Sequence, residues 1–292
     1  MDCTDAIVAD FSAVGVRGCV HVREVDGEAQ VMVGADEPVV LASVVKVLLV
    51  TEFARQVAAG QCDPAERVRV RAVDRLGGAG TAGCLDDVDI SWRDLAAFAM
   101  SLSDNTAADM LLHRIGVDTV RDLAVQLGLT ATRIVGGPRQ LIESMYADVG
   151  AVDAARFAEV FPALGPERLA RLAVLDPMRT NASTPRDMTR LLSLIWRDEA
   201  GPAAACRRVR ELMARQACGH RLAAAFDADV VVAAKSGSVI DVRNEVGVAV
   251  CPDGRRYAIA VFTCGGWGMR RPDVDAAIGR VARRAVDFLY SG

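Results

Sequence analysis

Strand-like segments lie near the two ends of this chain, and their placement constrains its fold more than any other feature. The segments are residues 15–25, 28–34, 230–234, 245–250 and 256–262. Asp26-Gly27 is a hairpin signal between the first two, and Asp253-Gly254 is one between the last two. Because strands must pair with one another, we predict that both ends of the chain contribute to one five-stranded antiparallel sheet.

Helical periodicity dominates the middle of the chain. It runs through residues 43–59, 91–99, 105–116, 118–127 and 186–197. Glycines at Gly60, Gly116 and Gly128 are plausible helix stops. A last helix, about residues 273–290, is expected to pack on the sheet. The predicted fold class is therefore α+β, an α/β sandwich in which terminal helices flank the sheet and an all-helical subdomain is inserted.

This layout predicts two subdomains within one structural unit. Residues 1–42 and 198–292 would form the sheet subdomain, and residues 43–197 the helical one. Pockets are frequent where two such bodies meet, so we expect the active site between them.

Composition excludes several classes of protein. The 292 residues are 52% hydrophobic and 25% charged with a net charge of −4, so no basic stripe is offered to nucleic acid. No apolar run reaches the eighteen residues of a membrane span. Acidic residues near Met1 interrupt any signal peptide, and we expect a cytoplasmic protein that is a monomer or a weak homodimer.

Cysteines and histidines give no metal signature. The eight cysteines form no C-x-x-C pair, and we expect them to be free thiols in a reducing compartment. His21, His113 and His220 stand in separate contexts and are interpreted as packing or surface residues. We therefore expect no metal site and no cofactor.

Lysine is confined to two positions. Of the 34 basic residues only Lys46 and Lys235 are lysines, and each lies in a motif, Ser43-Val44-Val45-Lys46 or Lys235-Ser236-Gly237. A desolvated lysine can lose its proton and act as a base, whereas arginine stays charged. Lys46 lies in an almost wholly apolar helical segment, and residues three apart share a helix face. We therefore expect a buried Lys46 beside a nucleophilic Ser43, whose amide at the helix start can stabilise an oxyanion.

The other motifs predict a substrate site. Lys235 can attract a substrate carboxylate, the hydroxyl of Ser236 can bond to it, and Gly237 leaves room for the backbone. Between the two lysine motifs lies Ser103-Asp104-Asn105, before a helix start. Ser103 or Asp104 is also expected to cap that helix.

With these three motifs in this order, the chain resembles the class A branch of the superfamily of serine β-lactamases and penicillin-binding proteins, identified by S-x-x-K, S-D-N and K-[TS]-G. Asp94-Leu95-Ala96 and Thr184-Pro185 add to the likeness, which covers roughly residues 5 to 290. The derived layout agrees with the family fold.

The resemblance implies a role for each matching residue. Ser43 would form an acyl-enzyme with Lys46 as base, and Ser103 would hand a proton to the leaving nitrogen. Asn105 would hold the substrate, and the amide of Ser238 would complete the oxyanion hole. Arg243 resembles an arginine that many class A enzymes use to bind the substrate carboxylate.

One family feature is missing. Class A enzymes activate the deacylating water with a glutamate in a Glu-x-x-x-Asn pattern, and no such pattern occurs here. Residues 136–181 depart from that loop and are expected to contain helices near residues 154–159 and 167–175. Glu143 and Glu167 are the candidate replacements.

The leading hypothesis is a serine acyl hydrolase that cleaves a carboxylate-bearing lactam, amide or ester through acyl-Ser43, with at most weak β-lactamase activity. One alternative is a cytoplasmic esterase, amidase or acyltransferase acting on a small metabolite. Another is an acyl trap or ligand-binding pseudoenzyme, because an acyl-serine without an activated water persists.

Overall fold

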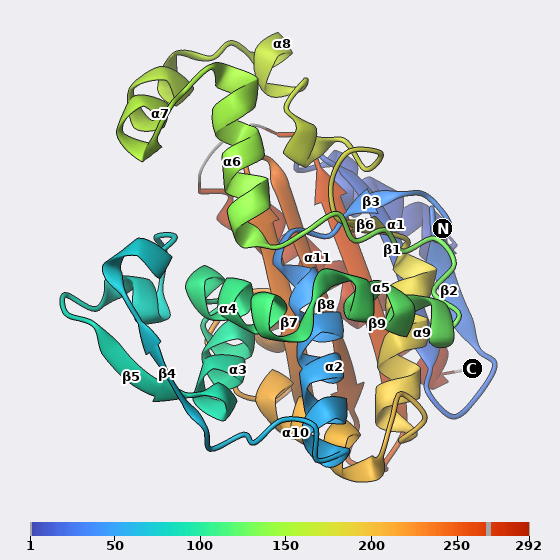
Figure 1. Cartoon of the computed structure of the whole chain (residues 1–292). Coiled ribbons are helices and arrows are strands. Elements are labelled where there is room, and N and C mark those ends of the chain that lie inside the picture. Colours follow the sequence, from blue (N-terminus) through green and yellow to red (C-terminus); the bar gives the residue numbers. More distant parts are fainter. Residues whose placement is uncertain (1, 267–269, 292) are drawn as a thin grey trace.

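A central five-stranded antiparallel sheet organises the protein, in a computed structural model that describes residues 2–266 and 270–291 (Figure 1). Its strand order is β2-β1-β9-β8-β7. The strands are β1 (Arg17–Glu24), β2 (Gln30–Val33), β7 (Val231–Val239), β8 (Val242–Val250) and β9 (Arg256–Cys264). The predicted sheet built from both ends of the chain is confirmed, with β1 paired to β9.

Central strands are buried on both faces, as β9 illustrates. Ala258, Ala260 and Phe262 pack into one core, and the alternate residues Ile259 and Val261 pack into the other. Alternation along a strand directs successive side chains to opposite faces. One hydrophobic core therefore lies on each side of the sheet.

The two terminal helices cover one face, as predicted. They are α1 (Cys3–Ser12) and α11 (Pro272–Ser291), joined there by the short η6 (Ala223–Ala225). Val274, Ile278 and Val281 recur on one face of α11 and are fully or almost fully buried in the core beneath it. The helix is therefore amphipathic and lies flat on the sheet.

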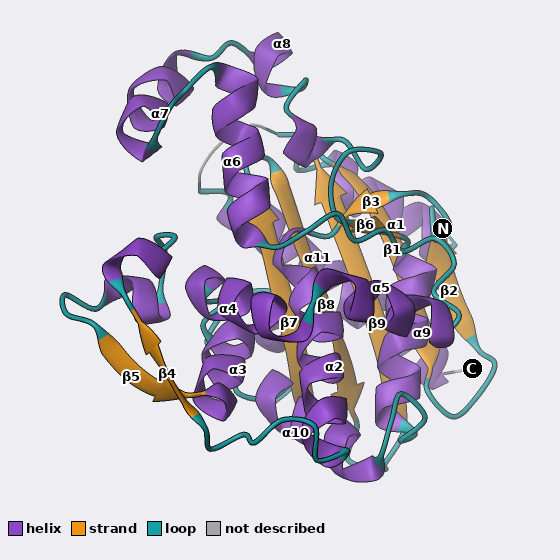
Figure 2. Ribbon diagram, in the orientation of Figure 1, coloured by secondary structure: helices purple, strands orange, loops and turns teal. Residues whose placement is uncertain are grey.

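A second group of helices lies on the opposite face (Figure 2). They are η1 (Ala42–Val45), α2 (Lys46–Ala58), α3 (Trp92–Ser101), α4 (Asn105–Ile115), α5 (Val117–Gln126), α9 (Pro185–Trp196) and α10 (Ala203–Met213). Helices α9 and α10 contact the sheet, and α2 packs against α3, α4, α5 and α10. Three of these helices begin at an N-cap residue whose side chain accepts a hydrogen bond from a backbone amide of the first turn: Ser91 for α3, Asp104 for α4 and Thr184 for α9.

The insert is not all helical, which corrects that part of the prediction. It contains a two-stranded ribbon of β4 (Arg67–Val70) and β5 (Val88–Ser91), and its strand β6 (Ala182–Ser183) pairs with β3 (Val39–Val40). The short 3₁₀ helices η2 (Ala72–Asp74) and η3 (Gly80–Gly83) lie between β4 and β5. Runs of two to four residues are too short to show a strand period.

Residues 136–181 form a helical arm that extends above the body in Figure 1. The arm comprises α6 (Pro138–Val149), α7 (Ala154–Val160), η4 (Phe161–Ala163), α8 (Pro166–Leu169) and η5 (Ala173–Leu175). It has a small core of its own around Val149, Leu164, Leu172 and Val174. Val239, the last residue of β7, and Ile240 in the turn that follows pack against this core. The arm therefore reaches the sheet at the end of β7.

Among the helices of the described residues, none combines the length and the apolarity needed to cross a bilayer.

Candidate active site

Ser43 lies where the chain turns from β3 into the buried helix α2. It belongs to η1, and Lys46 begins α2. The preceding residue, Ala42, has a φ of 47°, in the left-handed region that non-glycine residues rarely occupy. Such strain persists only where surrounding contacts hold it, and it is common at active sites.

Lys46 is buried, as expected, with 1% of its surface exposed. Its Nζ donates to the carbonyl oxygen of Ser103 at 2.6 Å, to Asn105 Oδ1 at 2.8 Å and to Ser103 Oγ at 3.3 Å. Burial, and then the positive charge of Lys235, holds the pKa of Lys46 well below its ordinary value, although Asp104 raises it. The lysine therefore joins the first and second motifs, and its neutral form is more accessible than that of a solvent-exposed lysine.

The Ser103-Asp104-Asn105 loop owes its shape to two features. Ser103 has a φ of 57°, and in this turn both its carbonyl and its hydroxyl lie within reach of Lys46. Asp104 is fully buried and caps α4, accepting from the amide of Ala107 at 3.0 Å and from the hydroxyl of Thr81 at 2.8 Å. Of the two candidate caps, Asp104 is the one used, which leaves the Ser103 hydroxyl beside Lys46.

Strand β7 brings the third motif to the same place. Lys235 is fully buried, and its Nζ donates to the carbonyl oxygen of Ser236 at 2.8 Å. Burial lowers the pKa of Lys235 to about 8, while negative charge on Cys218 and Glu245 acts to raise it. Lys235 therefore carries its positive charge at neutral pH and loses it as the pH rises through about 8.

Gly237 allows β7 to approach the nucleophile. A Cβ at this position would lie 2.8 Å from the carbonyl oxygen of Leu41 and 3.2 Å from the amide nitrogen of Ser43. The expected need for backbone room is thus met by a close contact between β7 and η1.

The amide of Ser238 points toward the free edge of the sheet. β7 is an edge strand, and the amide of Ser236 donates outward to Gln216 Oε1. Alternate residues present their amides to the same edge, so the amide of Ser238 also points away from β8. Both amides expected to hold an oxyanion therefore come from segments in contact with each other.

Sequence reasoning missed Arg221, which lies behind this strand. Its side chain is 3% exposed, and it donates to the carbonyl oxygen of Gly237 at 3.1 Å, to Ser238 Oγ at 2.7 Å and to Asp275 at 2.7 Å. The predicted Arg243 lies nearby, with Nη1 3.5 Å from the same aspartate. Nothing in the sequence distinguishes Arg221 from the other arginines, because its partners are distant along the chain.

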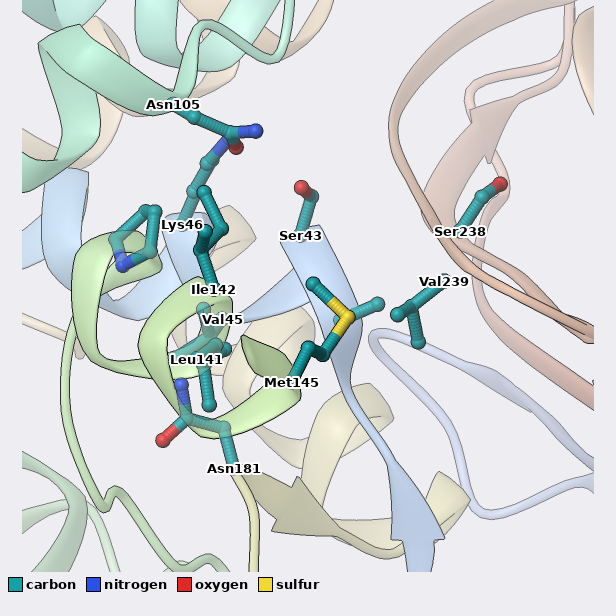
Figure 3. A pocket seen from close by; sticks show the side chains of 12 residues that line it. Ser43, Val45, Lys46, Asn105, Leu141, Ile142, Met145, Asn181, Ser238 and Val239 are labelled. Atoms are coloured by element: carbon teal, nitrogen blue, oxygen red, sulfur yellow. The ribbon is translucent and has the colours of Figure 1, made fainter. Parts of the chain in front are cut away.

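A cavity of about 180 Å³ opens at Ser43. Its residues are Ala42, Ser43, Val45, Lys46, Asn105, Pro138, Leu141, Ile142, Met145, Asn181, Ser238 and Val239. Figure 3 shows Ser43 between Lys46 and Asn105 on one side and Ser238 and Val239 on the other. Leu141, Ile142 and Met145 of α6 form an apolar wall of this cavity.

Neither candidate glutamate reaches the cavity. Glu143 lies on α6 between wall residues but is exposed, and Glu167 is exposed on α8 near the far end of the arm. Neither is among the residues that line the cavity. The arm thus presents apolar side chains where a carboxylate was expected.

No group of three or more histidine, cysteine, aspartate or glutamate side chains within residues 2–266 and 270–291 is arranged to hold a metal ion.

Comparisons with known proteins agree with this architecture. A family model described as "Beta-lactamase enzyme family" matches residues 3–289. The β-lactamase regulatory protein BlaB of Streptomyces cacaoi is 27% identical over 291 residues, covering 94% of this chain and 93% of BlaB.

Two solved structures show the same fold. A β-lactamase from Sphaerobacter thermophilus superposes with a TM-score of 0.78 at 23% identity, covering 97% of this chain and 95% of that one. A mutant of PBP-A, in an acyl-enzyme complex with penicillin G, superposes with a TM-score of 0.79 at 20% identity, covering 99% and 97%.

Proposed function

The chain belongs to the β-lactamase enzyme family, and on this premise we propose that it is an acyl-serine enzyme that reacts with carboxylate-bearing lactams, amides or esters. Ser43 Oγ attacks the carbonyl carbon while Lys46 accepts its proton. The amides of Ser43 and Ser238 hold the oxyanion. Ser103 then gives its hydroxyl proton to the leaving atom and takes up the proton that Lys46 had accepted, across the contact between Lys46 Nζ and Ser103 Oγ.

The observation that carries this proposal is the placement of Lys46. Its amine is buried and donates hydrogen bonds to Ser103 and Asn105. The pKa of Lys46 is lowered as a result of this burial. It lines the same cavity as Ser43. A base in this state can take a proton at neutral pH, which a surface lysine cannot.

A carboxylate on the substrate is favoured by two buried cations at the end of β7. Lys235 and Arg221 are buried, and Arg221 donates to the hydroxyl of Ser238, a residue that lines the cavity. A substrate carboxylate placed near Ser236 and Ser238 would meet net positive charge.

Slow deacylation follows from the apolar wall. Leu141, Ile142 and Met145 line the side of the cavity formed by the arm, and no carboxylate side chain of the described residues lines it. Water that enters an acyl-Ser43 complex would therefore lack a carboxylate base on this side, so turnover would be weak.

The same wall favours a second candidate, a regulatory acyl trap. In this case the long-lived acyl-enzyme is itself the signal, with no need for hydrolysis. The likeness to a protein named as a β-lactamase regulatory protein supports this reading.

Intact-protein mass spectrometry against time, after mixing with a penicillin or a chromogenic cephalosporin, tests the proposal. We expect one adduct per chain that persists for many turnover times of an efficient hydrolase and is absent in Ser43→Ala. Absence of any adduct with the wild-type protein would overturn the proposal and direct the search to esters of small metabolites.

Two substitutions on α6 then locate the cause of slow release. Ile142→Glu places a carboxylate in the wall and is expected to shorten the adduct lifetime by about 10-fold or more, within the range of general-base catalysis. Glu143→Gln is the matched control and should leave the lifetime unchanged. Fast release that depends on Glu143 or Glu167 would contradict the assigned role of the wall.

A further inference from the structure

A thiol lies next to the lysine motif on β7. Cys218 follows α10 in a segment that Gln216 ties to the sheet. Gln216 Oε1 accepts from the amide of Ser236, and its Nε2 donates to the carbonyl oxygen of Cys218 at 3.0 Å and to Glu245 Oε1 at 2.6 Å. One side chain thus bonds directly to both Ser236 and the backbone of Cys218.

Cys218 is one member of a thiol, imidazole and carboxylate group. Its Sγ lies 3.5 Å from His220 Nδ1 and 3.6 Å from Nε2. His220 Nε2 in turn lies 3.5 Å from Asp275 Oδ2. The imidazole can accept the thiol proton, and the carboxylate can stabilise the imidazolium that results. Asp275 is the residue that also pairs with Arg221 and Arg243 at the site.

Accessibility separates this thiol from most others in the chain. Cys19, Cys62, Cys206 and Cys251 are buried, whereas Cys218 is half-buried beside an exposed His220. Cys264 is exposed at the end of β9, where the charged groups that act on its thiol are Arg17 and Asp241, which makes it the natural comparison.

The surroundings of the thiol carry net positive charge. Lys235, Arg221 and Arg243 contribute three cations, against the carboxylates of Asp275 and Glu245. An anionic reagent is therefore drawn to this thiol more than a neutral or cationic one.

We propose that Cys218 is a thiol–disulfide exchange site for low-molecular-weight disulfides that carry carboxylates, and that the mixed disulfide closes the carboxylate-binding side of the Ser43 cavity. The second half of this inference rests on the proposed function. In the exchange, the Cys218 thiolate attacks one sulfur of the reagent, the reagent's S–S bond breaks, and a new S–S bond forms. The proton that His220 received passes to the released thiolate or, where that thiolate is a weak base, to water. The disulfide itself is the oxidant, so no other is needed.

Exchange is measured with 5,5′-dithiobis(2-nitrobenzoate), a dianionic aromatic disulfide whose released thiolate absorbs light, on the folded full chain. We expect one fast equivalent in the wild-type protein and in Cys264→Ser, and its loss in Cys218→Ser. His220→Gln should slow it about 10-fold, because the thiol then lacks its base. Neutral dithiodipyridine and cationic cystamine serve as comparison reagents, and the rate of each at Cys218 is divided by its rate with free cysteine. We expect this ratio to be lower for both than for the dianionic reagent.

The effect on Ser43 is read separately. Protein carrying the mixed disulfide at Cys218 should be acylated by a penicillin about 10-fold more slowly than unmodified protein, with full recovery after dithiothreitol, and Cys218→Ser should be insensitive to the reagent. A fast equivalent that survives in Cys218→Ser, or unchanged acylation of the modified protein, would overturn the inference. If unmodified protein is never acylated, the proposed function fails. The release of thiolate from the reagent, and the dependence of its rate on the charge of the reagent, still decide whether the exchange site exists.

Discussion

At the scale of single residues, the two lysines differ in what surrounds their amines. Lys46 has three acceptor contacts from the Ser103-Asp104-Asn105 loop, and its pKa is strongly lowered. The pKa of Lys235 is lowered only to about 8. The first environment suits a base and the second a permanent charge at neutral pH.

Exchanging each lysine for arginine separates these roles. Lys46→Arg should lower the rate of acylation at least ~100-fold, because arginine presents no neutral nitrogen. Lys235→Arg should stay within ~10-fold of wild type, because it keeps the charge. Adduct formation by mass, with thermal melts to show that both variants fold, measures the difference. Equal and mild losses would contradict this division of roles.

The motif residues could be predicted from sequence because each sits in a short, ordered pattern. Arg221 could not, since its contacts with Gly237, Ser238 and Asp275 exist only after the sheet and α11 have assembled. The positions of Glu143 and Glu167 could not be predicted either, because they depend on how the helices of the arm pack and on which helix face is turned toward the cavity.

At the scale of elements, the contact between β7 and η1 sets the spacing of the two amides that are proposed to hold the oxyanion. Gly237→Ala would place a methyl group 2.8 Å from a backbone oxygen, and a backbone segment cannot move aside at low cost. We expect acylation to slow by about 10- to 100-fold, since misplacement by about 1 Å can cost this much.

Gly83→Ala is the matched control for Gly237→Ala. A Cβ at Gly83 would meet nothing within 4 Å. Acylation rates of the two variants, measured under the same conditions, test the contact. A rate in Gly237→Ala equal to that in Gly83→Ala would show that the amides tolerate a wider spacing.

Elements with long apolar periods were predicted well, and the others were missed for physical reasons. Residues 46–54 of helix α2 and residues 257–263 of strand β9 are buried, so their pattern is plain. Helix α10 is rich in alanine and arginine, and α6 divides its apolar residues between the cavity and the arm's own core, so each gives a weak signal. Strands β3 and β6 are two residues each and pair with each other, which is too short a run to show a strand period.

At the scale of the whole molecule, His21 links the sheet to the helical half. It is fully buried on β1, with Nδ1 2.5 Å from Thr189 Oγ1 of α9 and Nε2 2.9 Å from Gln30 Oε1. Burial lowers its pKa to about 4, and the nearby Arg186 and Arg23 act in the same direction. The assembled protein therefore holds this histidine neutral.

Acid should weaken the assembly through this residue. The unfolded chain takes up the proton near pH 6.5, so the contribution is complete above that pH and is lost as the pH falls toward 4. A shift of this size corresponds to about 3 kcal/mol in the free energy of unfolding. Urea unfolding at pH 7.5 and 4.5 should show a smaller pH dependence in His21→Gln than in wild type.

The exposed His113 provides the control. His113→Gln should reproduce the wild-type difference between the two pH values. If His21→Gln does so as well, the buried imidazole is not what makes the junction acid-sensitive.

Both lysine side chains of this protein are interior groups, 1% and 0% exposed. The folded surface therefore displays no lysine ε-amine, although it is rich in guanidinium groups. Acetyl donors, ubiquitin ligases and amine-coupling resins would find no lysine to attack until the chain unfolds. Labelling at lysine is thus a direct report of unfolding in this molecule, and the residues that would then be marked are the two assigned to its chemistry.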